Sequence, residues 1–506
     1  MRLKLHRMLQ SLQGRSACRK PISRRLSVEC LEGRCLLSAN VLQTNLVSDL
    51  QGVAQHFDPN LVNPWGISES PTSPFWVSDN NAGVATLYNT QGVPQSLVVS
   101  IPRPGDPTGA SGTPTGTVFN TTLATKTPGF MITNGVKSAP AIFLFATEDG
   151  TIVGWNPGIN PVGSDPAKAG TFGTIAVNNS GNNFTEPDPL KQTGAVYKGL
   201  AIATDANGRT LLYATNFRSG KVEVYDTKFQ LVTTLPAGAF TDPHLPKGYA
   251  PFNVQELGGK IYVTYAKQNA AKHDDVAGQG HGFVDVFNLD GTPGLADGKV
   301  RLITRGQLDS PWGLAIAPAS FGELAGALLV GNFGNGRIHA YDAKTGHFLG
   351  TLKDPDGEPI QIDGLWALKV GNGGNGGDAN KVYFTAGLFH ETHGLFGSLT
   401  PVAEGTPEGL AEAQMVQAAL DVFQMDLKVV LNDISSGVTG TALQQAIRDL
   451  DAAFVDLAQA EIRFAIDSRN DLSPHKHHGV DSDNDAARVA LDDVFADLGS
   501  LLRVLG

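Results

Sequence analysis

The sequence predicts an all-β fold, a six-bladed β-propeller, followed by a small C-terminal α-helical bundle. Three observations carry this prediction. A motif of short strands recurs six times between residues 40 and 404. Turn-forming Gly, Asn and Asp residues bound the strands within each copy. After residue 405 the spacing of apolar residues changes from the two-residue period of a strand to the 3.6-residue period of a helix.

The six copies begin near residues 65, 131, 199, 252, 312 and 365. In the third copy, residues 212–215 and 222–225 are β-prone runs, and Asn207-Gly208 supplies the positive φ of a tight hairpin turn. One antiparallel meander cannot cover both of its faces alone, whereas six packed radially do so. We therefore predict a propeller over 40–404. It should be closed by pairing of residues 41–47 with 395–399, because an unpaired edge invites aggregation.

The two ends of the chain differ from this body in charge and pattern. Residues 1–39 are basic and contain all three cysteines, so we expect an export or sorting segment outside the fold. The absence of thiols after Cys35 excludes disulfides and a catalytic cysteine from the folded part. Residues 405–506 are acidic, and their apolar spacing predicts three amphipathic helices at roughly 408–433, 440–468 and 484–505.

Composition excludes two classes of protein. The formal net charge is −11, and an acidic body repels phosphate backbones, so nucleic acid is not an expected partner. Apolar residues make up 41% of the chain, enough for a sizeable core, yet no stretch reaches the roughly 20 consecutive apolar residues of a transmembrane helix.

Two sets of motifs resemble known families. Residues 24–39, RRLSVECLEGRCLLSA, resemble the LEPR-XLL sorting motif of bacterial exported and surface proteins. The motifs NPWGI, FWVSDNNAG, SPWGLA and HGLFGSLTP together resemble an uncharacterised family of bacterial exported propellers, similar in style to NHL-type and gluconolactonase-type six-bladed propellers. The resemblance implies an extracellular or cell-surface location and no particular reaction.

Candidate site residues follow from propeller geometry, because two kinds of loop open on one mouth of the channel. These are the loops that lead into each innermost strand and the turns between the second and third strands of each blade. The first set offers Asn63, Trp65, Lys198, Asn253, Trp312, Asp363 and Trp366, and the second offers Asp79, Asn80, Glu148, Asp149, Asn216, Asn332 and His390.

A ring of such oxygen donors could hold Ca²⁺, with Asp363, Asn80 and Asn216 as the first choice of ligands. The other interpretation is that Asn and Asp form turns and hydrogen-bond their own backbone, while the tryptophans pack between blades.

A long loop in the fourth blade carries His273, Asp275 and His281. These side chains could bind a transition metal or act as acid and base, or they could belong to a solvated polar loop. In the acidic tail, Asp481, Asp483, Asp485 and Asp492 match the spacing of a calcium loop, but Ala486 stands where that loop needs glycine, so a helix N-terminus is the better interpretation.

Two functions remain open. The first is a ligand-binding or scaffolding module at the cell surface, which takes a small-molecule or surface ligand and whose helical tail binds a surface partner. The alternative is a metal-dependent hydrolase of the lactonase type, with its site at the propeller mouth. Calcium is the one cofactor considered for either. A mouth plugged by apolar side chains would instead favour the tail as the functional element.

Overall fold

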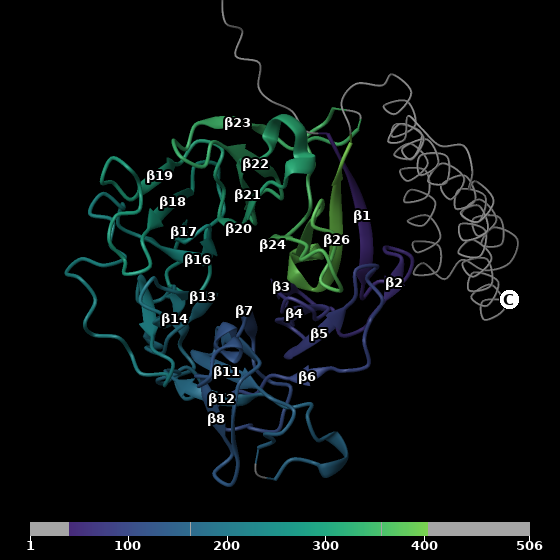
Figure 1. Ribbon diagram of the computed structural model, residues 1–506, viewed down its shortest axis with the longest axis vertical. Coiled ribbons are helices and arrows are strands. Elements are labelled where there is room, and N and C mark those ends of the chain that lie inside the picture. The colour runs from purple at the N-terminus through teal and green to yellow at the C-terminus, as the bar shows by residue number, and fades with distance from the viewer. Residues whose placement is uncertain (1–39, 162, 356, 403–506) are drawn as a thin grey trace, which may run out of the picture. The chain divides into compact units, whose positions relative to one another are not determined.

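The computed structural model describes residues 40–402 apart from residues 162 and 356. These residues form a ring of antiparallel sheets around a central channel, the predicted six-bladed propeller (Figure 1). The basic segment 1–39 and the helices predicted after residue 405 lie outside the described residues. Within the described part, no helix is long and apolar enough to cross a membrane.

The first two blades are four-stranded sheets whose first strand lines the channel. Blade 1 contains β3 (Pro64–Ser68), β4 (Phe75–Asp79), β5 (Val84–Tyr88) and β6 (Val99–Ser100). Blade 2 contains β7 (Pro114–Phe119), β10 (Phe143–Thr147), β11 (Thr151–Trp155) and β12 (Thr174–Asn178). Between β7 and β10 lie the 3₁₀ helix η1 (Thr121–Ala124) and a hairpin of β8 (Met131–Thr133) and β9 (Ser138–Pro140).

Blade 2 corrects one expectation. We expected its first strand near residue 131, but that segment forms the β8–β9 hairpin, and the innermost strand is β7. The segment 114–119, PTGTVF, is rich in Thr and Gly and has the composition of a turn. The signal that identifies it is Pro-x-Gly, which it shares with the innermost strands at 64–66 and 311–313.

Blades 3 to 5 follow the same plan. Blade 3 has three strands: β13 (Tyr197–Thr204), β14 (Thr210–Asn216) and β15 (Lys221–Tyr225). Blade 4 contains β16 (Tyr249–Leu257), β17 (Lys260–Lys267), β18 (Gly282–Phe287) and β19 (Arg301–Thr304). Blade 5 contains β20 (Pro311–Ile316), β21 (Leu328–Asn332), β22 (Ile338–Tyr341) and β23 (Phe348–Thr351). Further 3₁₀ helices are η2 (Pro166–Lys168), η3 (Pro189–Lys191) and η4 (Ala319–Leu324).

Blade 6 joins the two ends of the ring. It contains β24 (Leu365–Val370), β25 (Val382–Gly387) and β26 (His393–Pro401), and its outer strand is β1 (Val41–Ser48) from the start of the propeller. The register pairs Val47 with Phe396 and Ser48 with Leu395. This confirms the predicted closure. A short parallel strand, β2 (His56–Phe57), extends the sheet, and the tight segment α1 (Leu388–Glu391) connects β25 to β26.

Each innermost strand carries a β-bulge near its first residues, where the register against the second strand shifts. Glycines allow the neighbouring blades to approach at these bulges. A Cβ on Gly66 would lie 2.5 Å from the carbonyl oxygen of Thr115, and one on Gly116 would lie 2.3 Å from the nitrogen of Leu200. The glycines therefore let the strands of neighbouring blades pack closely at the bulges.

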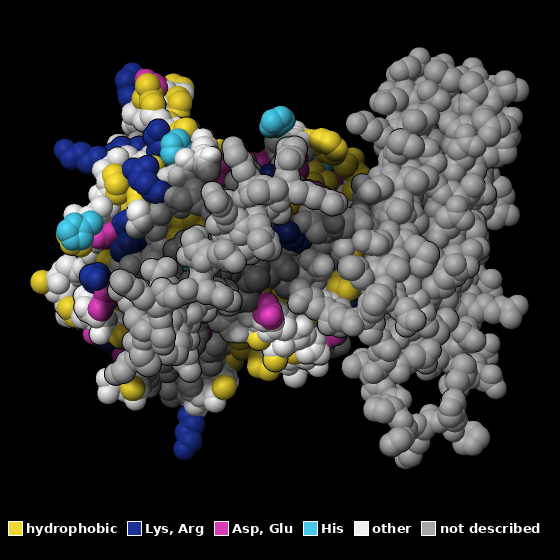
Figure 2. Space-filling view, turned by 90° about the horizontal axis from the view of Figure 1, so that it is seen from above, with side chains coloured by type: hydrophobic (Ala, Val, Ile, Leu, Met, Phe, Trp, Pro, Cys, Tyr) yellow, Lys and Arg dark blue, Asp and Glu magenta, His cyan; other side chains and the backbone are white. Residues whose placement is uncertain are grey.

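The outer surface mixes side chains of both charges. On the side shown in Figure 2, Lys and Arg side chains are interspersed with Asp, Glu and hydrophobic ones.

Candidate functional site

An aromatic cluster closes the channel beneath the mouth. Trp65 stacks on Trp366 with ring centroids 3.5 Å apart, and Trp312 meets both rings edge-on at 6.2 and 5.9 Å. Phe252 and Phe333 also contact Trp366, at 5.9 and 4.0 Å. The three tryptophans are at most 4% exposed. They therefore pack between blades, as the second interpretation of the sequence expected.

Blade 3 has a charged side chain, Lys198, at the bulge position where the other blades have a neutral one. The side chains at the bulges of blades 1 to 6 are Trp65, Thr115, Lys198, Phe252, Trp312 and Trp366. Lys198 is 2% exposed, and its Nζ lies 4.9 Å from the Trp65 ring centroid. The same Nζ forms an ion pair with Glu148 and lies 3.7 Å from Asp274 Oδ1. Lys198 thus links the aromatic cluster to the carboxylates above it.

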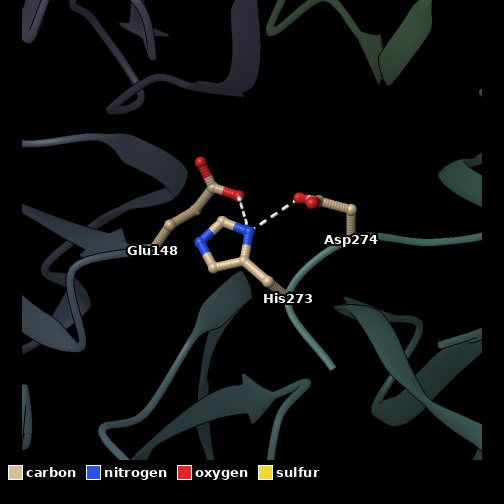
Figure 3. Close-up of side chains that lie close together, drawn as sticks. All are labelled: Glu148, His273 and Asp274. Atoms are coloured by element: carbon tan, nitrogen blue, oxygen red, sulfur yellow. Dashed lines mark hydrogen bonds and ion pairs between the residues drawn. The ribbon is translucent and has the colours of Figure 1, made fainter. Parts of the chain in front are cut away.

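Glu148 comes from the β10–β11 turn and meets the long loop of blade 4 (Figure 3). Its Oε1 lies 4.0 Å from His273 Nδ1, and that nitrogen lies 2.7 Å from Asp274 Oδ1. Asn80 Nδ2 donates a hydrogen bond of 3.0 Å to Glu148 Oε2. Figure 3 shows the carboxylates of Glu148 and Asp274 and the imidazole of His273 pointing toward one another, with Glu148 on one side and His273 and Asp274 on the other.

The charges in this cluster support one another. Burial alone would raise the pKa of Glu148, but Lys198, His273 and Asn80 outweigh it and lower that pKa. Burial would likewise lower the pKa of Lys198, yet Glu148 and Asp274 raise it. The pKa of Asp274 falls to about 2, because hydrogen bonding to His273 and the charge of Lys198 overcome its partial burial. Glu148 and Asp274 are therefore ionised and Lys198 is protonated at neutral pH.

A strained turn presents a further carboxyl group at the mouth. Phe389, His390 and Glu391 have φ values of 51°, 57° and 67°, three consecutive non-glycine residues in the left-handed region. Such conformations cost on the order of 1–3 kcal/mol each and persist only where the surroundings impose them.

Three hydrogen bonds hold the turn. Asp363 Oδ2 accepts from the Phe389 N–H at 2.8 Å, and Asn81 Nδ2 donates to the Glu391 carbonyl oxygen at 2.6 Å. Asn63 Nδ2 donates to Glu391 Oε2 at 3.1 Å. Asn63 Oδ1 in turn accepts from Trp366 Nε1 at 3.0 Å, so the turn is tied to the aromatic cluster.

Glu391 differs from the other carboxylates in protonation. Partial burial and the negative charges of Glu148, Asp275 and Asp274 raise its pKa to about 7, with Lys198 opposing them. Burial also raises the pKa of Asp275, and Ser310 and Lys198 oppose that shift. The mouth therefore holds ionised carboxylates beside a carboxyl group that exchanges its proton near neutral pH.

Each residue expected to form the calcium ring is hydrogen-bonded to another part of the propeller. Asp363 and Asn63 hold the α1 turn, and Asn80 donates to Glu148. The others bond within their own or the next blade: Asn216 to Glu223, Asn253 to the Trp312 carbonyl, Asn332 to the Gln307 carbonyl, and Asp79 to Thr86. The asparagines contribute their Nδ2 nitrogens to these bonds, and among the described residues Asn332 Oδ1 and Asp79 Oδ1 are buried without a hydrogen-bond partner. The calcium ring therefore stays a prediction.

The remaining candidates are divided between the mouth and its margin. His273 and Asp275 join the charged cluster. His281 Nδ1 donates to the Val276 carbonyl oxygen of its own loop at 2.8 Å, and His390 is exposed on the α1 turn. Asp149 accepts from the Thr113 N–H at 2.8 Å.

The cluster could accommodate a metal ion at a different place from the one expected. Glu148, His273 and Asp274 bring three ligand atoms within 4.8 Å of one another. However, the ammonium group of Lys198 already contacts the same Glu148 oxygen. A cation bound there would have to displace a buried positive charge.

Sequence reasoning missed Glu391. Its position depends on the left-handed turn, and Phe, His and Glu are not residues that signal this conformation. Lys198 and Glu148 were among the residues expected at the mouth, because the repeat places their loops there.

Comparison with known proteins places the chain among relatives without an assigned function. No family model matches the sequence. Two uncharacterised proteins of Acanthamoeba polyphaga mimivirus are each 32% identical to it, over 358 and 359 residues. The alignments cover 70% of this chain and 78% and 84% of the viral proteins. The chain belongs to the same family as these two proteins. These relatives are viral, whereas the sequence motifs suggested a bacterial family.

Solved structures are less similar to this chain than these viral proteins are in sequence. The PQQ-bound aldose sugar dehydrogenase of Streptomyces coelicolor is 13% identical with a TM-score of 0.38, and covers 71% of this chain and 98% of its own. A streptogramin B lyase is 12% identical with a TM-score of 0.35, and covers 71% of this chain and 97% of its own.

Proposed function

We propose that the propeller is a ligand-binding module whose site is the mouth formed by Glu148, Lys198, His273, Asp274 and Glu391. One observation carries the proposal: these five ionisable side chains come from blades 2, 3, 4 and 6 and form one charged cluster. Most of their free atoms are acceptors, so the ligand we infer is rich in hydrogen-bond donors, such as a sugar or an amine.

Folding stability alone does not explain why the protein has a charged cluster at this position. A buried ion pair is often replaced by apolar side chains at no cost in stability, whereas an unpaired buried charge costs several kcal/mol. The other five bulge positions carry neutral side chains, four of them aromatic. A neutral residue in place of Lys198 would complete the aromatic plug, so the charged alternative points to recognition of a ligand.

The test is ligand-induced thermal stabilisation of the full chain. Glucose, galactose, N-acetylglucosamine, cellobiose and spermidine are the probes, because they separate hydroxyl donors from amine donors. A ligand that binds the folded state raises the melting temperature with its concentration. Asp274→Asn should abolish the rise, and the exposed Glu358→Gln on blade 5 should keep it. A flat response to all five probes would oppose the proposal.

The second candidate is a metal-dependent hydrolase of the lactonase type. The 4.8 Å grouping of Glu148, His273 and Asp274 favours it, and the ion pair of Lys198 with Glu148 opposes it. Metal analysis of purified protein, with lactone and ester hydrolysis assayed before and after chelation, decides between the two. Chelator-sensitive hydrolysis would place the hydrolase first.

We also propose that the protein acts outside the cytoplasm and that its tail binds a surface partner. The basic LEPR-XLL-like segment 24–39 and the thiol-free body support this location. Fractionation of cells expressing the full chain tests it, and recovery in the cytoplasm alone would contradict it. The tail, 405–506, should show a helical circular dichroism spectrum when expressed by itself.

A further inference from the structure

A polar cavity lies between the loops of blades 3 and 4, next to the charged cluster. Its volume is about 410 Å³, which is in the range of small-molecule pockets in proteins. Three stretches of chain line it: residues within 190–194, which lead into β13, residues within 216–219, at the β14–β15 turn, and residues 270–272 of the blade 4 loop. A space of this size accommodates a small organic molecule rather than a bare inorganic ion.

Arg218 is a buried cation that lines this cavity, and it is 9% exposed. Its Nη1 donates hydrogen bonds of 2.6 Å to Asn183 Oδ1 and of 2.9 Å to the Gly194 carbonyl oxygen, and its Nη2 donates one of 3.0 Å to Gln192 Oε1. All three acceptors are neutral, and Nε is buried without a hydrogen-bond partner among the described residues. These bonds fix the position of the guanidinium group and leave its charge uncompensated.

No acidic side chain in the described part of the chain forms an ion pair with Arg218. Two carboxylates near the cavity are bonded to other groups. Asp274 pairs with Lys198, and Glu223 accepts a hydrogen bond of 2.7 Å from Asn216. Buried charges in proteins are ordinarily paired, because removing an unpaired charge from water is costly. Arg218 is therefore a buried cation whose counter-ion is not found among the described residues.

The contrast with Lys198, a compensated cation in the same region, agrees with this geometry. Glu148 and Asp274 raise the pKa of Lys198 although burial opposes them. Burial lowers the pKa of Arg218, and the charge of Asp274 is what opposes it. A guanidinium group stays protonated at neutral pH in either case, because its ordinary pKa lies far above 7. Arg218 thus keeps its charge without a carboxylate in contact.

The lining of the cavity is positive although the protein is acidic. Arg218 and Lys272 are its charged side chains, and no Asp or Glu of the described residues belongs to the lining. The whole chain has a formal net charge of −11. Lys272 is exposed and likewise forms no ion pair within the described part of the chain. Two such cations attract an anion, and a guanidinium group binds a carboxylate or a phosphate through parallel N–H donors.

We propose that this cavity binds a small organic anion through its carboxylate or phosphate group, with Arg218 as the counter-ion and Lys272 as a second, outer contact. Neutral acceptors already hold the guanidinium group in place, so little ordering is needed when the anion binds. The site goes beyond the proposed function, because the five side chains of the mouth do not line this cavity and the ligand supplies acceptors instead of donors. Each proposal can therefore fail without the other.

Calorimetric titration of the full chain with three related sugars tests the proposal. Glucuronate carries a carboxylate, glucose 6-phosphate carries a phosphate, and glucose carries neither. We expect at least one of the two anions to bind about tenfold or more tightly than glucose, because it gains hydrogen bonds to a charged group. The tighter anion identifies the group that the site takes. Its affinity should fall as sodium chloride is added, since salt screens the attraction. Equal affinities for all three sugars, or no binding of either anion, would overturn the proposal.

Variants show whether the anion binds at this cavity. Arg218→Gln should weaken binding of the anion by about tenfold or more, and Lys272→Gln, at an exposed position, by about two- to fivefold. Arg337→Gln is the matched control, because Arg337 is an exposed arginine at the β21–β22 turn, the equivalent turn of blade 5, and it should keep the wild-type affinity.

The variants also separate this site from the mouth. Should Arg218→Gln not fold, Lys272→Gln on the surface still tests the cavity. If the variants that fold bind the anion as tightly as the wild type does, the proposal is wrong. Glucose binding that Asp274→Asn abolishes and Lys272→Gln retains would support the mouth as a separate site, whatever the result for the anions.

Discussion

Replacing Lys198 by methionine isolates the electrostatic contribution of the charged cluster. Methionine retains an unbranched apolar stem against Trp65 and Phe217, so little packing is lost. The Glu148 side chain, 11% exposed, would lose its cationic partner. Removing one member of a buried ion pair costs about 3–5 kcal/mol. We expect the free energy of unfolding to fall by that amount in Lys198→Met.

A double variant separates lost charge from lost packing. In Lys198→Met/Glu148→Gln the amide oxygen can still accept the hydrogen bond from Asn80, and neither member of the original Lys198–Glu148 pair leaves an unpaired charge. Stability should therefore return to within about 1 kcal/mol of the wild type. Urea unfolding followed by tryptophan fluorescence measures this, since all five tryptophans of the chain lie in the propeller. A single variant that loses less than about 1 kcal/mol, or a double variant no more stable than the single, would refute the reasoning.

Acid should reduce the destabilisation caused by Lys198→Met. In the wild type the pKa of Glu148 is lowered on folding, so its contribution to stability is present above the unfolded value of 4.5 and is lost as the pH falls through the folded value. In Lys198→Met burial raises that pKa instead, so the folded state binds the extra proton. The deficit of the variant should therefore shrink as the pH falls from 8 to 5.

Three further outcomes follow from the described structure. Deleting 40–50 removes β1 with the buried Val41, Leu46 and Val47, and should lower the melting temperature by roughly 10 °C or more; an unchanged value would mean that closure does not depend on β1. Gly116→Ala places a Cβ 2.3 Å from the Leu200 nitrogen and should cost about 1–3 kcal/mol or more in urea unfolding, whereas Gly374→Ala, with no atom nearer than 3.4 Å, should be neutral; equal effects would contradict the close-packing argument. Because the pKa of Glu391 is raised to about 7, the folded state binds more protons than the unfolded state between pH 4.5 and 7. The free energy of unfolding of the wild type should therefore fall as the pH rises from 4.5 to 7, and Glu391→Gln should flatten this fall. Parallel profiles of the two proteins would show that the pKa of Glu391 is not perturbed.

The architecture could be predicted because its signals are local and repeated. Turn pairs such as Asn207-Gly208 and the Pro-Trp-Gly openings of β3 and β20 recur at similar intervals, and only radial stacking buries every copy. Blade 2 was misplaced because the apolar residues of its insertion, in β8, imitate an innermost strand more closely than the Thr-rich β7 does.

The site could be predicted only in part, because the sequence indicates which loop a side chain belongs to and not where that side chain points. Glu148, Lys198 and His273 were placed near the mouth by the repeat. Asn63 and Asp363 were placed there as well, but in the structure they support the turn that carries Glu391. That role becomes visible only from the positive φ values of Phe389, His390 and Glu391, and none of these residue types indicates a left-handed conformation.

The site lies where the repeat is broken. Five blades place a neutral side chain at the bulge, and blade 3 places Lys198 there. Its charge is compensated from both sides, by Glu148 of blade 2 and by Asp274 of blade 4. Blade 6 departs from the repeat through its strained β25–β26 turn, which adds Glu391. A propeller needs none of these departures to fill its core, since the other blades do so without them. Compensated charge and imposed strain therefore mark the same mouth independently, and this agreement is the strongest reason to search for the ligand there.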